Sequence, residues 1–133
     1  RKLLEIRIRI QEKYSSFMAS KRTPFHTKES DFLQKLQDLV TSRIDDTTLS
    51  VKDLEAAVNL GNMQLNRKLK ALTNNTPSGF IRLIRLQKAQ ELLGTTDLNI
   101  SEVAYEVGFS DPGYFARIFS KTFGVSPSEF RKK

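Results

Sequence analysis

Asparagine, methionine, arginine and lysine side chains recur at helical spacing between residues 62 and 70. Their positions, i, i+1, i+4, i+5 and i+8, lie on one face of an α-helix: Asn62, Met63, Asn66, Arg67 and Lys70. Asn can hydrogen-bond an adenine edge, Arg can bridge guanine O6 and N7, and Met can contact a thymine methyl. Arg67 and Lys70 could instead hold phosphate. The alternative is the solvated face of any surface helix, which is also polar.

A second set of candidate DNA-binding residues lies near the C-terminus: Pro112, Gly113, Ala116, Arg117 and Lys121. This face offers few hydrogen-bond donors apart from its two cations. Arg117 could read one guanine, and the small Pro-Gly-Ala surface would let the backbone approach DNA closely. We expect this face to anchor the protein on DNA more than it discriminates between bases.

The two sets belong to an internal repeat. At an offset of 49, Leu49, Val51, Asp53, Leu54 and Val58 match Leu98, Ile100, Glu102, Val103 and Val107. Further on the offset is 50, and Leu65, Arg67, Leu69, Pro77 and Phe80 match Phe115, Arg117, Phe119, Pro127 and Phe130. One inserted residue at a turn is what two copies of a helix-turn-helix should show.

The local chemistry of each copy agrees with this interpretation. Ser50 and Asn99 are good N-caps, and an acidic residue three positions later completes a capping box. The turn needs a residue that tolerates positive φ, which Asn59 and Gly108 supply. The first helix of each copy should bury its apolar positions: Val51, Leu54 and Val58, and Ile100, Val103 and Val107.

The sequence predicts three further helices: one before the two helix-turn-helix copies, one between them and one after them. From Ser30 an apolar stripe predicts a helix of about four turns that is broken by residues 45–48; its members are Phe32, Leu33, Leu36, Leu39, Val40 and Ile44. A connecting helix over 77–93, ended by Gly94 and Thr95, would be about 26 Å long. Ser126 opens a capping box for a C-terminal helix over 127–133. The connecting helix should let both copies meet major-groove segments about one turn, ~34 Å, apart.

The prediction is therefore an all-α fold: two helix-turn-helix subdomains joined by a long connecting helix, about seven helices, with an extra N-terminal linker helix. The subdomains span about 49–73 and 99–123 within a DNA-binding domain over 31–133. Residues 1–18 have a helical apolar seam that serves either a dimer or a linker packed on a neighbouring domain. Residues 19–30 are a polar linker containing Pro24 and the only histidine, His26, which we interpret as a surface residue.

Composition excludes several classes of protein. Net charge is +7 over 133 residues, but residues 1–30 carry +5 of it, so bulk basicity says little about residues 31–133. No apolar run approaches the ~18–20 residues of a membrane span. There is no cysteine, partnered histidine, phosphate-binding glycine loop or carboxylate pair with a plausible role, so we expect no enzyme, cofactor or metal. The absence of cysteine and of a signal peptide favours a cytoplasmic protein.

Other cations could touch phosphate or simply solubilise the surface. Arg82, Arg85 and Lys88 follow one another along the connecting helix, where solubilising is the favoured interpretation. Arg131, Lys132 and Lys133 form a cationic end expected to add non-specific affinity.

Over about residues 49–131 the chain resembles the AraC/XylS family of bacterial transcription regulators. Three strings carry the resemblance: LNRKLKALT, TPSGFIRLIRLQKAQELL and ISEVAYEVGFSDPGYFARIFSKTFGVSPSEFR. It implies a seven-helix, two-lobed domain with both recognition helices in the major groove. Carried over, the recognition positions are Asn62, Met63, Asn66 and Arg67, and Pro112, Gly113, Ala116 and Arg117. Glu55 and Gly61 depart from the family pattern, which usually has Ala and a capping Ser there.

The segment RKLLEIRIRIQEKYSSF resembles the junction in hybrid two-component regulators, where a receiver domain precedes such an output domain. The function expected is a sequence-specific transcription regulator, an activator. Its partners would be double-stranded DNA, RNA polymerase, an upstream receiver and, through the N-terminal helix, a second copy, with no membrane contact. The alternative is a helical protein-protein adaptor that has lost DNA binding.

Overall fold

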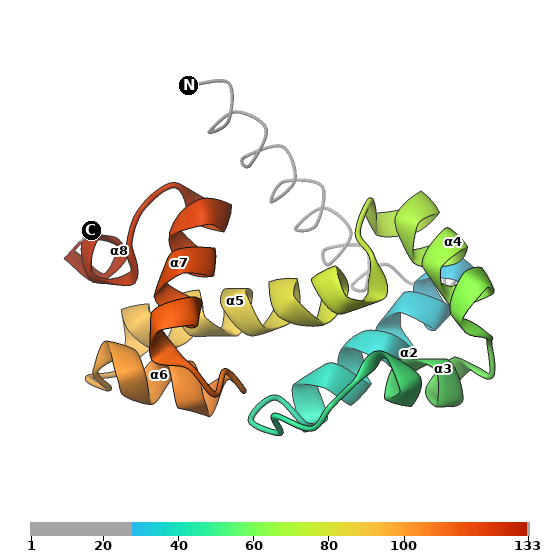
Figure 1. Ribbon diagram of the computed structural model, residues 1–133, viewed down its shortest axis with the longest axis horizontal. Helices are drawn as coiled ribbons and strands as arrows, with labels where there is room; N and C mark the ends of the chain where they lie inside the picture. Colours follow the sequence, from blue (N-terminus) through green and yellow to red (C-terminus); the bar gives the residue numbers. More distant parts are fainter. Residues whose placement is uncertain (1–27, 133) are drawn as a thin grey trace. The chain divides into compact units, whose positions relative to one another are not determined.

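The computed structural model describes residues 28–132, and these residues form seven helices and no strand (Figure 1). In chain order the helices are α2 (Lys28–Ser42), α3 (Val51–Val58), α4 (Asn62–Thr73), α5 (Pro77–Thr95), α6 (Ile100–Glu106), α7 (Pro112–Phe123) and α8 (Pro127–Lys132). The predicted all-α fold, with two helix-turn-helix pairs joined by a long helix, is confirmed. The expected linker helix at 1–18, residues 19–27 of the expected linker, and Lys133 lie outside the described residues.

Two helix boundaries differ from the sequence prediction. Helix α2 begins at Lys28, so residues 28–30 are helical and do not belong to the expected linker. Its first turn contains Glu29 and Asp31, whose negative charges stabilise the positive end of the helix dipole. Helix α5 runs on through Gly94 to Thr95. Two threonine hydroxyls add hydrogen bonds to carbonyls of its last turn, from Thr95 Oγ1 to Glu91 O at 2.7 Å and from Thr96 Oγ1 to Leu92 O at 2.7 Å; Leu92 O also accepts from Thr96 N at 3.0 Å.

The described chain divides into two compact units. The first unit comprises residues 28–43 and 48–84, and the second unit comprises residues 44–47 and 85–132. Helix α5 therefore begins in the first unit and ends in the second.

The core of the first unit is aliphatic with two phenylalanines. Helix α2 contacts α3, and α3 contacts α4. The buried side chains are Phe32, Leu33, Leu36, Val40, Leu49, Leu54, Leu65, Leu69, Phe80, Ile81, Leu83 and Ile84. Leu39 of the predicted stripe is only half-buried, as are Val51 and Val58 in α3. The ammonium of Lys68 lies 4.4 Å from the ring centre of Phe32, which adds a cation–π contact between α4 and α2.

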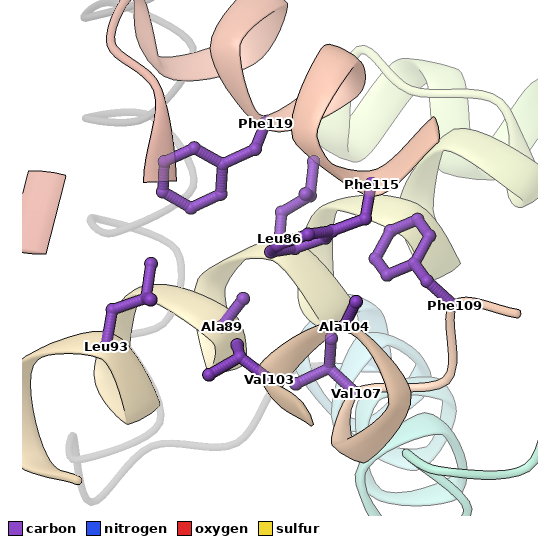
Figure 2. Close-up of a cluster of buried hydrophobic side chains, with 9 residues drawn as sticks. All are labelled: Leu86, Ala89, Leu93, Val103, Ala104, Val107, Phe109, Phe115 and Phe119. Carbon is purple, nitrogen blue, oxygen red and sulfur yellow. The ribbon is translucent and has the colours of Figure 1, made fainter. Parts of the chain in front are cut away.

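The core of the second unit contains a row of aromatic rings (Figure 2). Its buried members come from α5, α6, the turn after α6, and α7: Leu86, Ala89, Leu93, Val103, Ala104, Val107, Phe109, Phe115 and Phe119. The ring centre of Phe115 lies 5.2 Å from that of Phe109 and 5.7 Å from that of Phe119. Such tilted pairs are favourable beyond the area they bury, so α7 is held firmly on this core.

The tight turns adopt the predicted backbone conformation. Asn59 has φ 54° and Gly108 has φ 93°, so both occupy the positive-φ region. Positive φ values also occur at Asn74 and Gly124, where the second helix of each pair ends.

Candidate nucleic-acid interface

The first helix of each pair begins with the predicted capping pattern. In α6, Glu102 N donates to Asn99 Oδ1 and Asn99 N donates to Glu102 Oε1, both at 2.8 Å. In α3, Ser50 N donates to Asp53 Oδ2 at 2.8 Å. This backbone hydrogen bond, aided by Arg43 at 3.5 Å and opposed by partial desolvation, lowers the pKa of Asp53.

The second helix of each pair begins differently in the two copies. Asp111 caps α7, where its Oδ1 accepts from Gly113 N at 2.9 Å and from Tyr114 N at 3.3 Å. Gly61 caps α4 without any side-chain hydrogen bond. The N-terminus of α4 is therefore capped more weakly than that of α7.

The face of α4 named by the sequence is open to solvent. Asn62, Arg67 and Lys70 are exposed, Asn66 is half-buried, and Met63 is 74% exposed. Beneath them, Leu65 and Leu69 are fully buried, while Leu72 is only half-buried. An exposed thioether and an exposed guanidinium are groups that can make an apolar and a bidentate contact, respectively, with base edges.

Two side chains at the start of this face, Asn62 and Asn66, form a chain of hydrogen bonds with a carboxylate on α3. Asn66 Nδ2 donates to Asn62 Oδ1 at 3.1 Å and to Asn62 O at 2.9 Å. Asn62 Nδ2 in turn donates to Glu55 Oε2, on α3, at 3.4 Å. Glu55 is one of the two departures from the family pattern, and here it contacts a candidate base-reading residue.

The predicted face of α7 is less uniform. Gly113, Arg117 and Lys121 are exposed, whereas Pro112 and Ala116 are half-buried. Phe115 and Phe119 are fully buried, whereas Ile118 is half-buried.

Sequence analysis missed two exposed side chains beside these faces. Gln64 on α4 is exposed, and Tyr114 on α7 is 40% exposed with its ring centre 6.1 Å from that of Phe109. They occupy equivalent positions, because the repeat offset of 50 pairs residue 64 with residue 114. That equivalence was the signal that could have found them.

Two of the cations assigned to the surface are structural. Arg85 Nη2 donates to Asp46 O at 2.7 Å, and burial lowers the pKa of Arg85 because desolvation disfavours its charge. Arg131 donates to Leu93 O at 3.1 Å and to Thr96 O at 3.3 Å. Each guanidinium therefore makes a structural contact with backbone carbonyls that the sequence did not indicate, and the non-specific affinity expected from the charge of Arg131 stays a prediction. Lys88 pairs with Glu91 at 3.1 Å.

Within residues 28–132, no group of three or more His, Cys, Asp or Glu side chains is placed to hold a metal ion. In the same part of the chain, no helix combines the length and apolar character needed to cross a bilayer.

The family model for a helix-turn-helix domain matches residues 54–133. Histidine kinase P4 from Formosa agariphila is 33% identical to the chain over 135 residues; the match covers 98% of the chain but 10% of that kinase. The C-terminal domain of AraT, a response regulator from Geobacillus stearothermophilus, has a TM-score of 0.70 at 27% identity, covering 80% of this chain and 88% of that one.

The DNA-binding domain of AdpA, a global transcriptional factor, was solved in complex with a target DNA. It is similar to this chain with a TM-score of 0.63 at 27% identity, and the match covers 74% of this chain and 90% of that one. The similar structures thus include the C-terminal domain of a response regulator and a DNA-binding domain in complex with a target DNA.

Proposed function

The chain belongs to the family of AraC-type helix-turn-helix DNA-binding domains of transcription regulators, and from this premise we propose that it recognises one specific duplex site through α4 and α7. Each helix would lie in the major groove, in two segments about one helical turn apart. The main support is the paired placement of α4 and α7: each follows a tight positive-φ turn and presents an exposed arginine, Arg67 or Arg117, at equivalent positions of the repeat.

The two helices would contribute unequally. On α4, the exposed amide, thioether and guanidinium groups can discriminate base pairs. On α7, Arg117 and Lys121 supply charge beside the bare backbone of Gly113, which suits close contact with the phosphate backbone. We therefore assign sequence choice mainly to α4 and docking mainly to α7.

The regulatory setting is also a proposal. We propose an activator that contacts RNA polymerase and that is controlled by an upstream receiver domain in a longer protein. The support is that the similarity to histidine kinase P4 extends over 98% of the chain, well beyond the family match at residues 54–133. A similar structure is the C-terminal domain of a response regulator.

Selection of bound sequences from a randomised duplex pool tests the DNA proposal. Enrichment of one site, with footprint protection in two neighbouring major-groove segments on one face of the duplex, is the expected result. Fluorescence anisotropy at two salt concentrations should then show tighter binding at low salt, because cations displace counterions from phosphate. No binding at low salt would contradict the proposal and favour the protein-protein adaptor.

A further inference from the structure

Helix α3 contains a carboxylate, Glu55, that contacts the base-reading face of α4. Glu55 is half-buried, and its Oε2 accepts a hydrogen bond from the amide of Asn62 at 3.4 Å. Asn62 is the first residue of α4, directly after the cap Gly61. Glu55 therefore lies where a first-turn residue of the recognition helix can be oriented by a neighbour from another helix.

The amide of Asn62 is held from both sides. Its Nδ2 donates to Glu55, and its Oδ1 accepts from Asn66 Nδ2 at 3.1 Å. Asn66 Nδ2 also donates to the backbone carbonyl of Asn62 at 2.9 Å. An Asn reads adenine by donating to N7 and accepting from N6 at the same time, and in this arrangement Asn62 has both of its amide atoms engaged within the protein.

Apart from the second N–H of Asn62 Nδ2, the groups of this hydrogen-bond chain that are left to face a base are hydrogen-bond acceptors. Asn66 Oδ1 accepts no hydrogen bond within the described part of the chain, since its Nδ2 makes both of the amide's contacts. The Glu55 carboxylate can accept more than one hydrogen bond and carries negative charge. Acceptors in the major groove match the exocyclic amines of cytosine and adenine, and they oppose the O6 and N7 acceptors of guanine.

We propose that Glu55 is a positioning residue that sets the base preference of the first helix-turn-helix by holding Asn62 in the Asn66–Asn62–Glu55 hydrogen-bond chain. The start of α4 then selects a base with an exocyclic amine in the major groove, next to the base contacted by Arg67. This inference rests on the proposed DNA-binding function.

An effect of the negative charge of Glu55 and an effect of its hydrogen bond to Asn62 predict different results for substitutions at residue 55. Glu55→Gln keeps an acceptor for Asn62 but removes the negative charge. Glu55→Ala removes both, and the helix interior tolerates Ala better than any other residue. Glu106→Ala, in α6, is the matched control, because the Glu106 side chain is exposed and makes no hydrogen bond to the described residues.

The experiment is selection from a randomised duplex pool with the wild-type chain and the three variants, followed by anisotropy titrations over a range of salt. All three variants should bind duplexes that lack the selected site more tightly, since each loses a negative charge. Only Glu55→Ala should lose the cytosine or adenine preference, by roughly tenfold at one position, which corresponds to ~1.4 kcal/mol. Glu55→Gln should retain the preference.

The outcomes distinguish this inference from the function on which it rests. A wild-type chain that enriches no site contradicts the proposed function. A wild-type chain that enriches a site which Glu55→Ala enriches unchanged overturns only the role of Glu55. A loss of preference in both Glu55→Ala and Glu55→Gln would show that charge alone acts, and would also overturn positioning. Thermal unfolding of each variant confirms that folded protein is compared throughout.

Discussion

Arg85 and Gly108 share one small space in the second unit: a β-carbon added to Gly108 would lie 2.7 Å from Arg85 Nε and would collide with the carbonyl oxygen of Ile44. Arg85 Nη2 donates to Asp46 O at 2.7 Å, so the guanidinium is held in place and has little room to withdraw. The turn before α7 is thus packed directly against a half-buried arginine and the backbone of the 44–47 segment.

Gly108→Ala should destabilise the second unit strongly. The φ of 93° costs an alanine about 1–3 kcal/mol by itself, and the steric conflict adds to that cost. Chemical denaturation of the purified chain measures the loss.

Gly94→Ala is the control for this substitution. Nothing lies within 4 Å of an added β-carbon at residue 94, and the residue is inside α5. Alanine there should stabilise by roughly 0.5–1 kcal/mol. Equal destabilisation of both variants would mean that the space around Gly108 is not the cause.

Arg131→Ala should reduce stability more than DNA binding. Its guanidinium donates to the carbonyls of Leu93 and Thr96, at and just beyond the end of α5, and hydrogen bonds to a charged group are worth about 1.5–3 kcal/mol. Because Arg131 is half-buried, we expect the lower end of that range.

Lys132→Ala is the matched comparison for Arg131→Ala. Lys132 is exposed, so its loss should change stability by less than about 0.5 kcal/mol. Urea titrations of the two variants side by side are decisive, since equal unfolding midpoints would refute the capping role of Arg131.

The capping carboxylate of α3 should make stability depend on pH. The backbone N–H of Ser50 lowers the pKa of Asp53 in the folded chain below its ordinary value of 3.8. A carboxyl group with a lowered folded pKa stabilises the fold above its unfolded pKa, and this stabilisation is lost as pH falls through the folded pKa. Asp53→Asn should therefore lower the melting temperature at neutral pH and have little effect once the pH is well below 3.8.

The control for Asp53→Asn is a substitution at a carboxylate that does not cap a helix. Asp97 is exposed and accepts no hydrogen bond from the described residues. Asp97→Asn should leave the melting temperature close to wild type across the same pH range. If it behaves like Asp53→Asn, a general charge effect rather than the Ser50–Asp53 contact explains the result.

Much of this architecture could be predicted because its causes are local. Apolar periodicity, the two capping boxes and the turn residues Asn59 and Gly108 act within a few positions along the chain. The internal repeat then showed that the same set of local signals occurs twice in the chain.

Long-range partners could not be predicted in the same way. The position of Arg85 in the helical pattern of α5 does not indicate whether its guanidinium is solvated or binds a carbonyl. Its partner, Asp46, lies 39 residues away in the sequence. Arg131 bonds Leu93 across 38 residues for the same reason. Glu55 was visible only as a departure from a pattern, because its contact with Asn62 depends on how α3 packs on α4.

Arg67→Ala tests whether α4 reads bases. Arg67 is exposed, on the same face as Met63, and a bidentate Arg–guanine pair is worth about 1–3 kcal/mol of discrimination. The variant should lose that amount of affinity for the selected site and accept other bases at one position.

Lys121→Ala on α7 provides the contrast, because Lys121 is exposed and assigned to phosphate. Its loss should weaken binding to all duplexes alike and reduce the slope of log affinity against log salt by about 1. Competition titrations with matched and single-mismatch duplexes separate the two behaviours. If Arg67→Ala weakens every duplex equally, as Lys121→Ala should, then Arg67 contacts the backbone and the base preference of the first unit depends on the amides and Met63 alone.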